Sequence, residues 1–410
     1  MLFAFAKLQA QDYQISFAGS GESTTIETVL VQNLTQGTSL NLSGSDVLNL
    51  KKAITGIEQL TTNKDNSLQI YPNPMTSNST IEFEISKTSN VIIELFDITE
   101  NKVTTIQKNL QPGIQKFNVS GLNSGIYIVN ARSDDFVYSG KIISNGTSTG
   151  KAAITFINSN TNEHQAKLKI AQSIVSMQYN TGDRILLKAV SGIYSTIKTL
   201  IPVANSTETF NFVAATDYDG NNYTTVTIGT QVWMVENLKV THYRNGDVIA
   251  NVTDNKEWTN STNTGVFCWH NNDIANKASY GALYNWYAIY DERNIAPTGW
   301  HIPSDDEWTN LTDYLGGQAV AGGKMKEFGT KNWNTPNEAA TNESGFTSLP
   351  SSSRSAFDGS FGNLGDSGGY WSRTPLNTNA YYRFLSKDNA TAYRSNLSKI
   401  AGMGIRCVLD

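Results

Sequence analysis

The stretch SYGALYNWYAIYDERNIAPTGWHIPSDDEWTNLTDYL, Ser279–Leu315, combines helix signals, aromatic residues and a rigid turn, and it gives the clearest local signal in the chain. Its first part carries large apolar side chains at positions i, i+3, i+4 and i+7, which are Leu283, Trp286, Tyr287 and Tyr290. Side chains at this spacing share one face of a helix. The pattern therefore predicts a helix with one buried face.

A second helix is predicted to begin after Ser304. The Ser304 hydroxyl can accept the backbone N–H of Glu307 while the Glu307 carboxylate returns to the Ser304 N–H, which is the capping-box pattern. Asp305 and Asp306 add negative charge at the positive end of the helix dipole. We therefore attribute all three carboxylates to helix capping. An apolar stripe follows at Trp308, Leu311 and Leu315, and a glycine pair ends the helix.

Several short motifs follow one another through the C-terminal half. They are GWHIPSDDEW at 299–308, GGKMKEFGT at 322–330, ATNESGFTSLPSSSR at 340–354, GGYWSRT at 368–374 and GIRCV at 404–408. In this order they resemble the Fibrobacter succinogenes major paralogous domain, over residues 217–410. That family is similar to the formylglycine-generating type of C-type-lectin-like fold. The resemblance implies an α+β, C-type-lectin-like domain, here called the head.

Length and composition limit the remaining possibilities. A chain of 410 residues is expected to form two to four units, since a domain takes roughly 100 to 200 residues. The formal net charge of −5 offers no basic surface for phosphate backbones, so we exclude nucleic acid as a partner. Only 16% of the residues are charged, which favours an extracellular, β-rich protein.

The N-terminus carries a short apolar run and a small-residue pattern near Ala10. We interpret residues 1–11 as a truncated signal peptide, with an ordinary apolar N-terminus as the alternative. No later run approaches the roughly 18 apolar residues that a transmembrane helix needs. The predicted location is therefore secreted or at the cell surface, associated with the outer membrane.

Two segments, residues 12–60 and 150–215, are predicted to form β-strands. In residues 12–60 the side chains alternate, as at Tyr13, Ile15 and Phe17. Residues 150–215 contain short apolar runs between Asn and Gly turns, one of them at 168–171. We expect an Ig-like β-sandwich module in 150–215, with the strands of 12–60 wrapping back to complete it. The polar stretch 61–67 is expected to be a linker.

Residues 68–146 carry a second set of motifs. They are LQIYPNP at 68–74, IELFDITENKV at 93–103, SGLNSGIYIVNA at 120–131 and SGKIIS at 139–144. These resemble the sorting domain of the Bacteroidetes type IX secretion route, which implies a β-sandwich of about seven short strands. In that family the domain ends the chain, whereas here more than 260 residues follow it. The segment is therefore either an export signal or a β-spacer of related ancestry.

The chain has two cysteines, Cys268 and Cys407, and both lie in the head. In an oxidising compartment they can pair, so we predict a disulfide. The alternative is two buried free thiols. The four histidines form no ligand-spaced motif, which argues against a cysteine metal site.

An enzymatic function rests only on the resemblance to formylglycine-generating enzymes, which use reactive cysteines in a substrate groove. This chain has no second cysteine near Cys407, so that catalytic pair cannot be carried over. Metalloprotease, nucleophile-elbow and phosphate-loop motifs are also missing from the sequence. We therefore predict a non-catalytic protein. An orphan relative of those enzymes and a purely structural envelope component remain the alternatives.

Binding by the head is predicted to use the loops of Lys331–Arg373, because irregular loops on a rigid scaffold commonly carry function. The candidate ligand-binding residues are Trp333, Asn337, Glu338, Asp358 and Asp366. Their oxygens could hold calcium or accept hydroxyl protons of a sugar, and an aromatic face can stack on the ring. The ligand would be a glycan or another surface protein. The DYDGNNY stretch at 217–223 could also hold calcium, but a plain turn is the preferred interpretation.

Other residues of the head are assigned to packing. We expect Trp300, Trp308, Tyr370 and Trp371 to be core anchors rather than sugar platforms, and Asn342, Gly345, Phe346, Leu349 and Pro350 to fix loop conformation. Arg354 and Arg406 are expected to pair with buried carboxylates or carbonyls. Val226, Ile228, Trp233 and Val235 alternate around Gly229–Thr230, which predicts a hairpin with a two-residue turn. The closing GIRCV should return alongside this hairpin.

Overall fold

The computed structural model describes residues 12–52, 68–85, 88–99, 101–133, 136–147, 150–157 and 173–410. The chain folds as two compact units, the first with the described residues before 53 and after 172, and the second with those from 68 to 157. Both consist largely of β-strands. The predicted signal peptide at 1–11, the linker at 61–67 and the strand at 168–171 lie outside the described residues.

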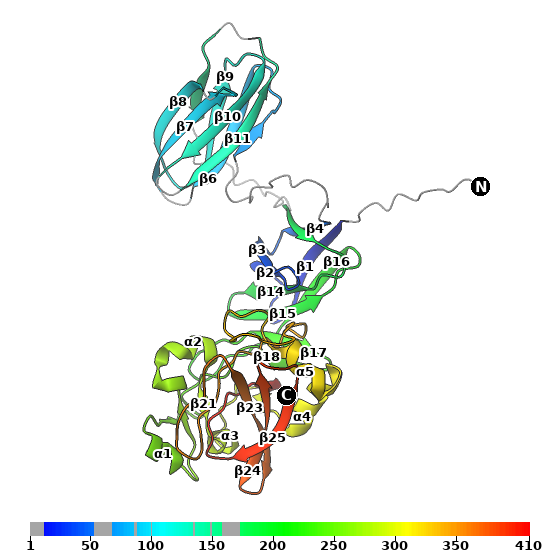
Figure 1. The fold of residues 1–410 in the computed structure, drawn as a ribbon, viewed down its shortest axis with the longest axis vertical. Coiled ribbons are helices and arrows are strands. Elements are labelled where there is room, and N and C mark those ends of the chain that lie inside the picture. The colour runs from blue at the N-terminus through cyan, green and yellow to red at the C-terminus, as the bar shows by residue number, and fades with distance from the viewer. Residues whose placement is uncertain are drawn as a thin grey trace, which may run out of the picture. The chain divides into compact units, whose positions relative to one another are not determined.

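The second unit is a β-sandwich (Figure 1). One sheet has the order β12-β9-β6-β5, with β5 (Gln69–Tyr71), β6 (Asn78–Ile85), β9 (Gly113–Ser120) and β12 (Ala153–Ile157). The other has the order β11-β10-β7-β8, with β7 (Ser89–Asp97), β8 (Lys102–Leu110), β10 (Gly125–Arg132) and β11 (Val137–Ser144). A shared apolar core holds them together, in which Phe83 stacks on Phe117 at 5.9 Å between ring centroids.

The first unit begins with a β-module built from two distant parts of the sequence. One sheet has the order β13-β4-β1-β16, with β1 (Tyr13–Gly21), β4 (Val47–Lys52), β13 (Ile174–Tyr179) and β16 (Ser206–Phe212). Strand β1 pairs in parallel with β16, and β4 in parallel with β13. The opposite sheet contains β2 (Thr28–Asn33), β3 (Thr38–Ser43), β14 (Ile185–Ser191) and β15 (Tyr194–Leu200). The N-terminal strands thus complete the module formed by 174–212, whereas residues 153–157, expected in the same module, form β12 of the second unit.

The sheet of the β-module continues into the head (Figure 1). Strand β15 pairs in parallel with β17 (Thr225–Ile228), which pairs with β18 (Gln231–Met234). Next come β26 (Val408–Leu409) and β22 (Trp300–His301), giving the order β22-β26-β18-β17-β15-β14-β2-β3. Because this sheet crosses the boundary expected near residue 216, the module and the head form one compact unit.

The predicted hairpin and closing strand are both confirmed. Ile228 pairs with Gln231 across the Gly229–Thr230 turn. Trp233 pairs with Val408, so the C-terminal strand returns alongside the hairpin. Outside the segment 277–314, the other elements of the head are α1 (Asn255–Thr259), β19 (Ala250–Asn251), β20 (Val266–Cys268), α5 (Gln318–Met325), β23 (Ser367–Leu376), β24 (Asn379–Ser386) and β25 (Ala392–Ser398), with short 3₁₀ turns at His270–Asn272 and Ile274–Asn276.

The first predicted helix is wrong in extent. The segment forms α2 (Lys277–Tyr280), then strand β21 (Leu283–Tyr284), then α3 (Trp286–Tyr290). Gly281 breaks it with φ 67°, and a Cβ there would lie 2.8 Å from the carbonyl oxygen of Leu238. The pattern still identified buried residues, since Leu283 and Trp286 are inside, but Tyr290 is exposed. Pairing of β21 with β20 overrides the helical spacing here.

The second predicted helix is confirmed as α4 (Asp305–Tyr314). The Ser304 hydroxyl accepts the Glu307 N–H at 3.2 Å, and the Glu307 carboxylate accepts the Ser304 N–H at 2.7 Å. The expected core anchors Trp300, Trp308, Tyr370 and Trp371 are all buried. The capping box therefore fixes where the helix starts, and the aromatic stripe fixes which face turns inward.

Asp305 does more than complement the helix dipole. Its carboxylate pairs with Arg383 at 2.6 Å and with Arg394 at 2.7 Å, and Arg383 is buried. Burial alone would raise the pKa of Asp305, but the hydrogen bonds from the two arginines outweigh it and lower the pKa. The start of α4 is thereby tied to β24 and β25.

His301 links the same helix start to the C-terminus. Its Nε2 lies 2.7 Å from Oε1 of Glu307, and its Nδ1 lies 2.6 Å from Oδ1 of Asp410. Both hydrogen bonds raise the pKa of His301, the one to Glu307 more than the one to Asp410, although partial burial acts to lower it. Although burial acts against it, the hydrogen bonds to His301 and Ser304 lower the pKa of Glu307.

Substitution of Ser304 by alanine is expected to lower the free energy of unfolding by about 1 kcal/mol, because an N-cap hydroxyl is lost. Chemical denaturation monitored by tryptophan fluorescence measures it. The control is Asn310→Ala, on an exposed position of α4, which should leave stability unchanged or slightly raised. Equal stability of the Ser304→Ala variant and the parent would contradict the cap.

Replacement of His301 by glutamine is expected to remove a pH-dependent part of the stability. A raised histidine pKa contributes stability below the ordinary value of 6.5, which is lost as pH rises through the folded-state pKa. The lowered pKa of Glu307 contributes stability above its ordinary value of 4.5, and this stability is lost as pH falls through the folded-state pKa. Melting temperatures of parent and variant should thus differ most between these values. A difference that stays constant from about pH 5 to about pH 9 would count against a stabilising role for the hydrogen bonds of His301.

Candidate functional site

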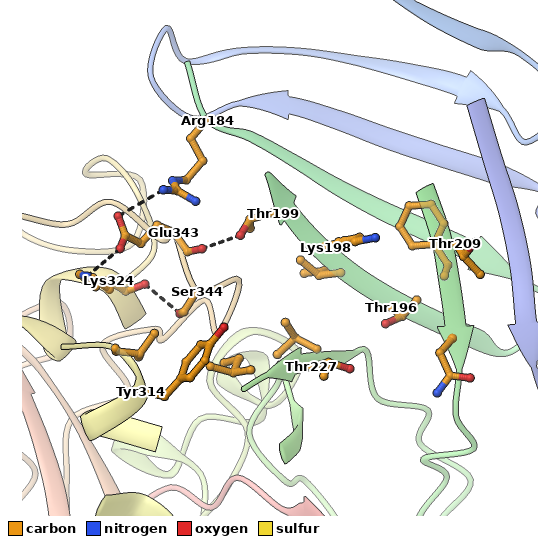
Figure 2. Close-up of a pocket in the computed structure, with 16 residues that line it drawn as sticks. Arg184, Thr196, Lys198, Thr199, Thr209, Thr227, Tyr314, Lys324, Glu343 and Ser344 are labelled. Atoms are coloured by element: carbon orange, nitrogen blue, oxygen red, sulfur yellow. Dashed lines mark hydrogen bonds and ion pairs between the residues drawn. The ribbon is translucent and has the colours of Figure 1, made fainter. Parts of the chain in front are cut away.

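A groove of about 540 Å³ lies in the first unit where β15, β16 and β17 face the C-terminal end of α4 (Figure 2). Its polar lining combines hydroxyl, amide and charged groups, namely Arg184, Thr196, Lys198, Thr199, Thr209, Asn211, Thr227, Tyr314, Lys324, Glu343 and Ser344. The β-module and the head each supply part of it. The groove therefore exists only because both belong to the same folded unit.

Strand β16 places two polar side chains in the groove by simple alternation. Thr209 and Asn211 are two residues apart, so they point to the same face of the strand, and both are exposed. Phe210 and Phe212 point to the other face and are buried in the core of the β-module. Packing of these two rings thus holds Thr209 and Asn211 in place.

Several polar groups in the groove are available to a ligand. The side chains of Thr209, Asn211 and Thr227 make no hydrogen bond within the part of the chain that the structure describes. By contrast, the Thr199 hydroxyl donates to the Glu343 carbonyl at 2.5 Å and so fixes the wall. The groove therefore pairs a tethered wall with free hydroxyl and amide groups.

Tyr314 contributes an aromatic ring at one end of the groove (Figure 2). It is the last residue of α4 and is 67% exposed. The ring lies against Gly229 of the hairpin turn, where a Cβ would approach it to 3.0 Å. The glycine has φ 62°, so the turn requires it and the absent side chain leaves room for the ring.

The charged groups of the groove centre on Glu343 (Figure 2). Its carboxylate lies 3.0 Å from Nζ of Lys324 and 3.7 Å from Nη2 of Arg184. Lys198, from β15, pairs instead with Glu208 at 2.5 Å. Cations from the β-module and from α5 therefore approach one carboxylate of the head.

The predicted loop residues Trp333 and Asn337 lie inside the head. Trp333 is 1% exposed, and its indole N–H donates to the Ser348 carbonyl at 2.9 Å. The Asn337 amide donates to the carbonyls of Glu327 at 3.0 Å and Gly329 at 2.6 Å. These contacts fix the loop, and they leave neither side chain a free surface for a ligand.

The other three predicted residues are at the surface. Glu338 is exposed, and its backbone N–H donates to the Lys387 carbonyl. The ammonium group of Lys387 pairs with the Asp366 carboxylate at 3.0 Å. Hydrogen bonds from Asn334 and Lys387 lower the pKa of Asp366. Asp358 accepts from Ser360 at 2.7 Å within its own turn. Glu338 and Asp366 are thus linked through Lys387, while Asp358 serves a separate turn.

Buried cations hold the long loops of the head. Lys326 donates to the carbonyls of Glu338 at 2.8 Å, Ser386 at 2.8 Å and Asn389 at 2.9 Å, and burial lowers its pKa to about 8. The expectation for Arg354 and Arg406 is confirmed for carbonyl partners. Arg354 donates to Gly359, Val252 and Thr253, and Arg406 to Met234, Phe346 and Thr347.

The predicted disulfide is wrong, because Cys268 and Cys407 are both free and buried. Cys268 lies on β20 in a small cluster with Trp258 and Leu283, whereas Cys407 precedes β26 and packs in the main core. Burial raises the pKa of Cys268 to about 11 and strongly raises that of Cys407. Two thiols held in separate clusters have no route to each other without repacking the head.

The acidic stretch at 217–223 forms a hydrogen-bonded turn. The Asp217 carboxylate accepts from Asn221 at 2.8 Å and from Tyr223 at 2.6 Å, and Asp219 accepts from the Thr241 N–H at 2.6 Å. These oxygens are used internally, which matches the preferred interpretation as a turn. In the described ranges, His, Cys, Asp and Glu side chains form no group of three or more that could hold a metal ion.

Comparison with protein families separates the two units in the same way as the motifs do. Residues 226–409 match the Fibrobacter succinogenes major domain. This major domain therefore begins on β17 and ends on β26, the two strands that flank β18 in the large sheet. The groove lies along its border, with Thr227, Tyr314 and Glu343 inside the match and the residues of β15 and β16 outside it.

The secretion system C-terminal sorting domain matches residues 69–145, which cover β5 to β11 of the second unit. The additional strand β12 lies beyond the match. A comparison with curated proteins found no match for this chain. Among the helices of the described residues, none has both the length and the apolar character needed to cross a bilayer.

Both cysteines are expected to react as free thiols once the protein is unfolded. Denaturation in guanidinium with iodoacetamide and without reductant should alkylate both Cys268 and Cys407, as measured by mass spectrometry. The native protein should resist the reagent because both sulfurs are buried. Recovery of an unmodified, linked pair of peptides from the unfolded sample would restore the disulfide.

Proposed function

We propose that this chain is a non-catalytic protein that binds a saccharide in the groove between the β-module and the major domain. The match to a sorting domain indicates a secreted or surface protein. In this proposal the major domain has a C-type-lectin-like fold, the β-modules are Ig-like, and the chain presents its groove from the outer membrane or after release.

The single observation that supports the proposal is the set of free polar groups beside an exposed aromatic ring. Sugar hydroxyls both donate and accept hydrogen bonds, and Thr209, Asn211 and Thr227 offer matching hydroxyl and amide groups. The apolar face of a sugar ring packs on an aromatic ring, and Tyr314 provides one. A cleft with a few fixed polar groups is also the usual form of a small-ligand site.

Binding without catalysis fits the chemistry of the head. Both thiols have raised pKa values, so they are protonated and poor nucleophiles at neutral pH. The carboxylates near α4 are engaged, Asp305 with two arginines and Glu307 in the capping box. The groove itself offers hydroxyls, amides and paired charges, which suit recognition.

The proposal predicts that a double Thr209→Ala and Asn211→Ala variant of the full chain loses saccharide binding. Each hydrogen bond contributes about 1 kcal/mol, so the loss of two corresponds to roughly a 30-fold weaker affinity. An array of neutral and acidic glycans identifies bound saccharides, and titration of the best one gives the dissociation constant.

The matched control is Asn41→Ala, an exposed asparagine on β3 of the same β-module that does not line the groove. It should bind as the parent does. Saccharide binding that survives the double variant would place the site elsewhere. An array on which the folded parent binds no glycan would reject the proposed function.

A further inference from the structure

The groove contains an internal carboxylate held where a ligand carboxylate could sit. Glu343 belongs to an irregular segment of the head, and its backbone is anchored by the Thr199 hydroxyl. Its side chain reaches between Lys324 and Arg184 (Figure 2). Lys324 belongs to α5 and Arg184 immediately precedes β14, so the carboxylate bridges parts of the chain that do not otherwise pair.

Arg184 is only weakly satisfied by this arrangement. The contact of 3.7 Å with Glu343 is an ion pair but too long for a hydrogen bond, since a charge-assisted bond measures about 2.7–2.9 Å. Within the described part of the chain the guanidinium donates no hydrogen bond, and the side chain is 27% exposed. Its planar set of N–H donors matches a carboxylate that approaches end-on.

The lining of the groove carries more positive than negative charge. Arg184, Lys198 and Lys324 face it, against Glu343 alone, although the whole chain has a net charge of −5. Lys198 is neutralised by Glu208, which lies outside the lining. The remaining excess of cations is therefore at Arg184 and Lys324, on both sides of Glu343.

We propose that the saccharide bound in this groove is acidic, and that its carboxylate displaces Glu343 to bind Arg184 and Lys324. The inference rests on the proposed function of the same groove and names the ligand class. Glu343 is then an internal competitor that occupies the cation pair in the empty groove. The sugar ring lies on Tyr314, and its hydroxyls meet Thr209, Asn211 and Thr227.

The test uses the full chain and an array of uronate- and sialate-bearing saccharides, each beside its counterpart with the carboxyl reduced to an alcohol. At least one acidic member should bind, and its reduced counterpart should bind at least ten times more weakly. Arg184→Gln and Lys324→Gln should each weaken the acidic ligand about tenfold. Glu343→Gln should strengthen it several-fold, because the competitor is gone. Added salt should weaken the binding.

The matched control is Lys188→Gln on β14. Lys188 also pairs with a glutamate, Glu236 at 3.9 Å, but it lines a different pocket of about 400 Å³. This variant should bind as the parent does, and all variants are first checked for an unchanged melting temperature.

Three results would overturn the inference. If acidic and reduced saccharides bind equally well and the double Thr209→Ala and Asn211→Ala variant binds neither, the proposed function stands and the acidic class is rejected. Acidic binding that is indifferent to Arg184→Gln and Lys324→Gln would place the carboxylate elsewhere. Weaker binding by Glu343→Gln would show that Glu343 contacts the ligand instead of competing with it.

Discussion

The parallel pairing of β15 with β17 joins the β-module to the head, and the rest of the first unit depends on it. The register is short, with Thr196 opposite Thr225 and Ile197 opposite Val226. Hydroxyl contacts reinforce it, since Thr196 donates to the Thr225 carbonyl at 3.1 Å and Ser195 to the Thr224 hydroxyl at 2.8 Å. Gly345 packs against Ile197 and Val226, where a Cβ would approach within 3.1 Å. Backbone, hydroxyls and a glycine contact thus close the same junction.

A groove between two parts of a chain needs both parts to be rigid. The walls from β15 and β16 are rigid because strand pairing and buried phenylalanines fix them. The wall from the head combines β17, residues of α4 and α5 and the irregular segment at Glu343 and Ser344, while elsewhere in the head buried cations donate to loop carbonyls. Lys326, Arg354 and Arg406 do this at three places, so the loops gain defined positions without regular secondary structure. The expected roles of Asn342 and Phe346 fit this picture, because the side-chain oxygen of Asn342 accepts the Thr347 N–H and Phe346 is buried.

Local chemistry was predictable from the sequence, and long-range pairing was not. The capping box at Ser304 depends on residues three apart, and the hairpin depends on Gly229–Thr230, so both followed directly from the residues. The helix around Leu283 failed because its pairing with Cys268, fifteen residues earlier, is decided by the sheet. The disulfide failed for a related reason, since two cysteines in one domain say nothing about which cluster each enters.

The candidate binding residues divide in the same way. Trp333 and Asn337 are in a loop of the kind that often binds ligands, but both are buried and make hydrogen bonds within the head. Thr209 and Asn211 were overlooked, although a signal was present. They alternate with Phe210 and Phe212, which marks them as the solvent face of a strand. That they line one groove with Tyr314 and Glu343 could not be predicted from the sequence, because it requires the β15–β17 pairing.

Strand β12 has a consequence for the second unit. It pairs with the edge of β9 from Ala153 to Ile157, and Phe156 packs edge-on against Phe117 at 5.1 Å between ring centroids. The sorting-domain match stops at residue 145, so the β9 edge of this sheet is covered by residues that the match does not include. A fragment trimmed at that limit would present the bare backbone of β9, and bare edges invite strands of neighbouring molecules to aggregate. The segment that follows the matched residues therefore protects β9, and β12 takes its place as the edge strand of the sheet.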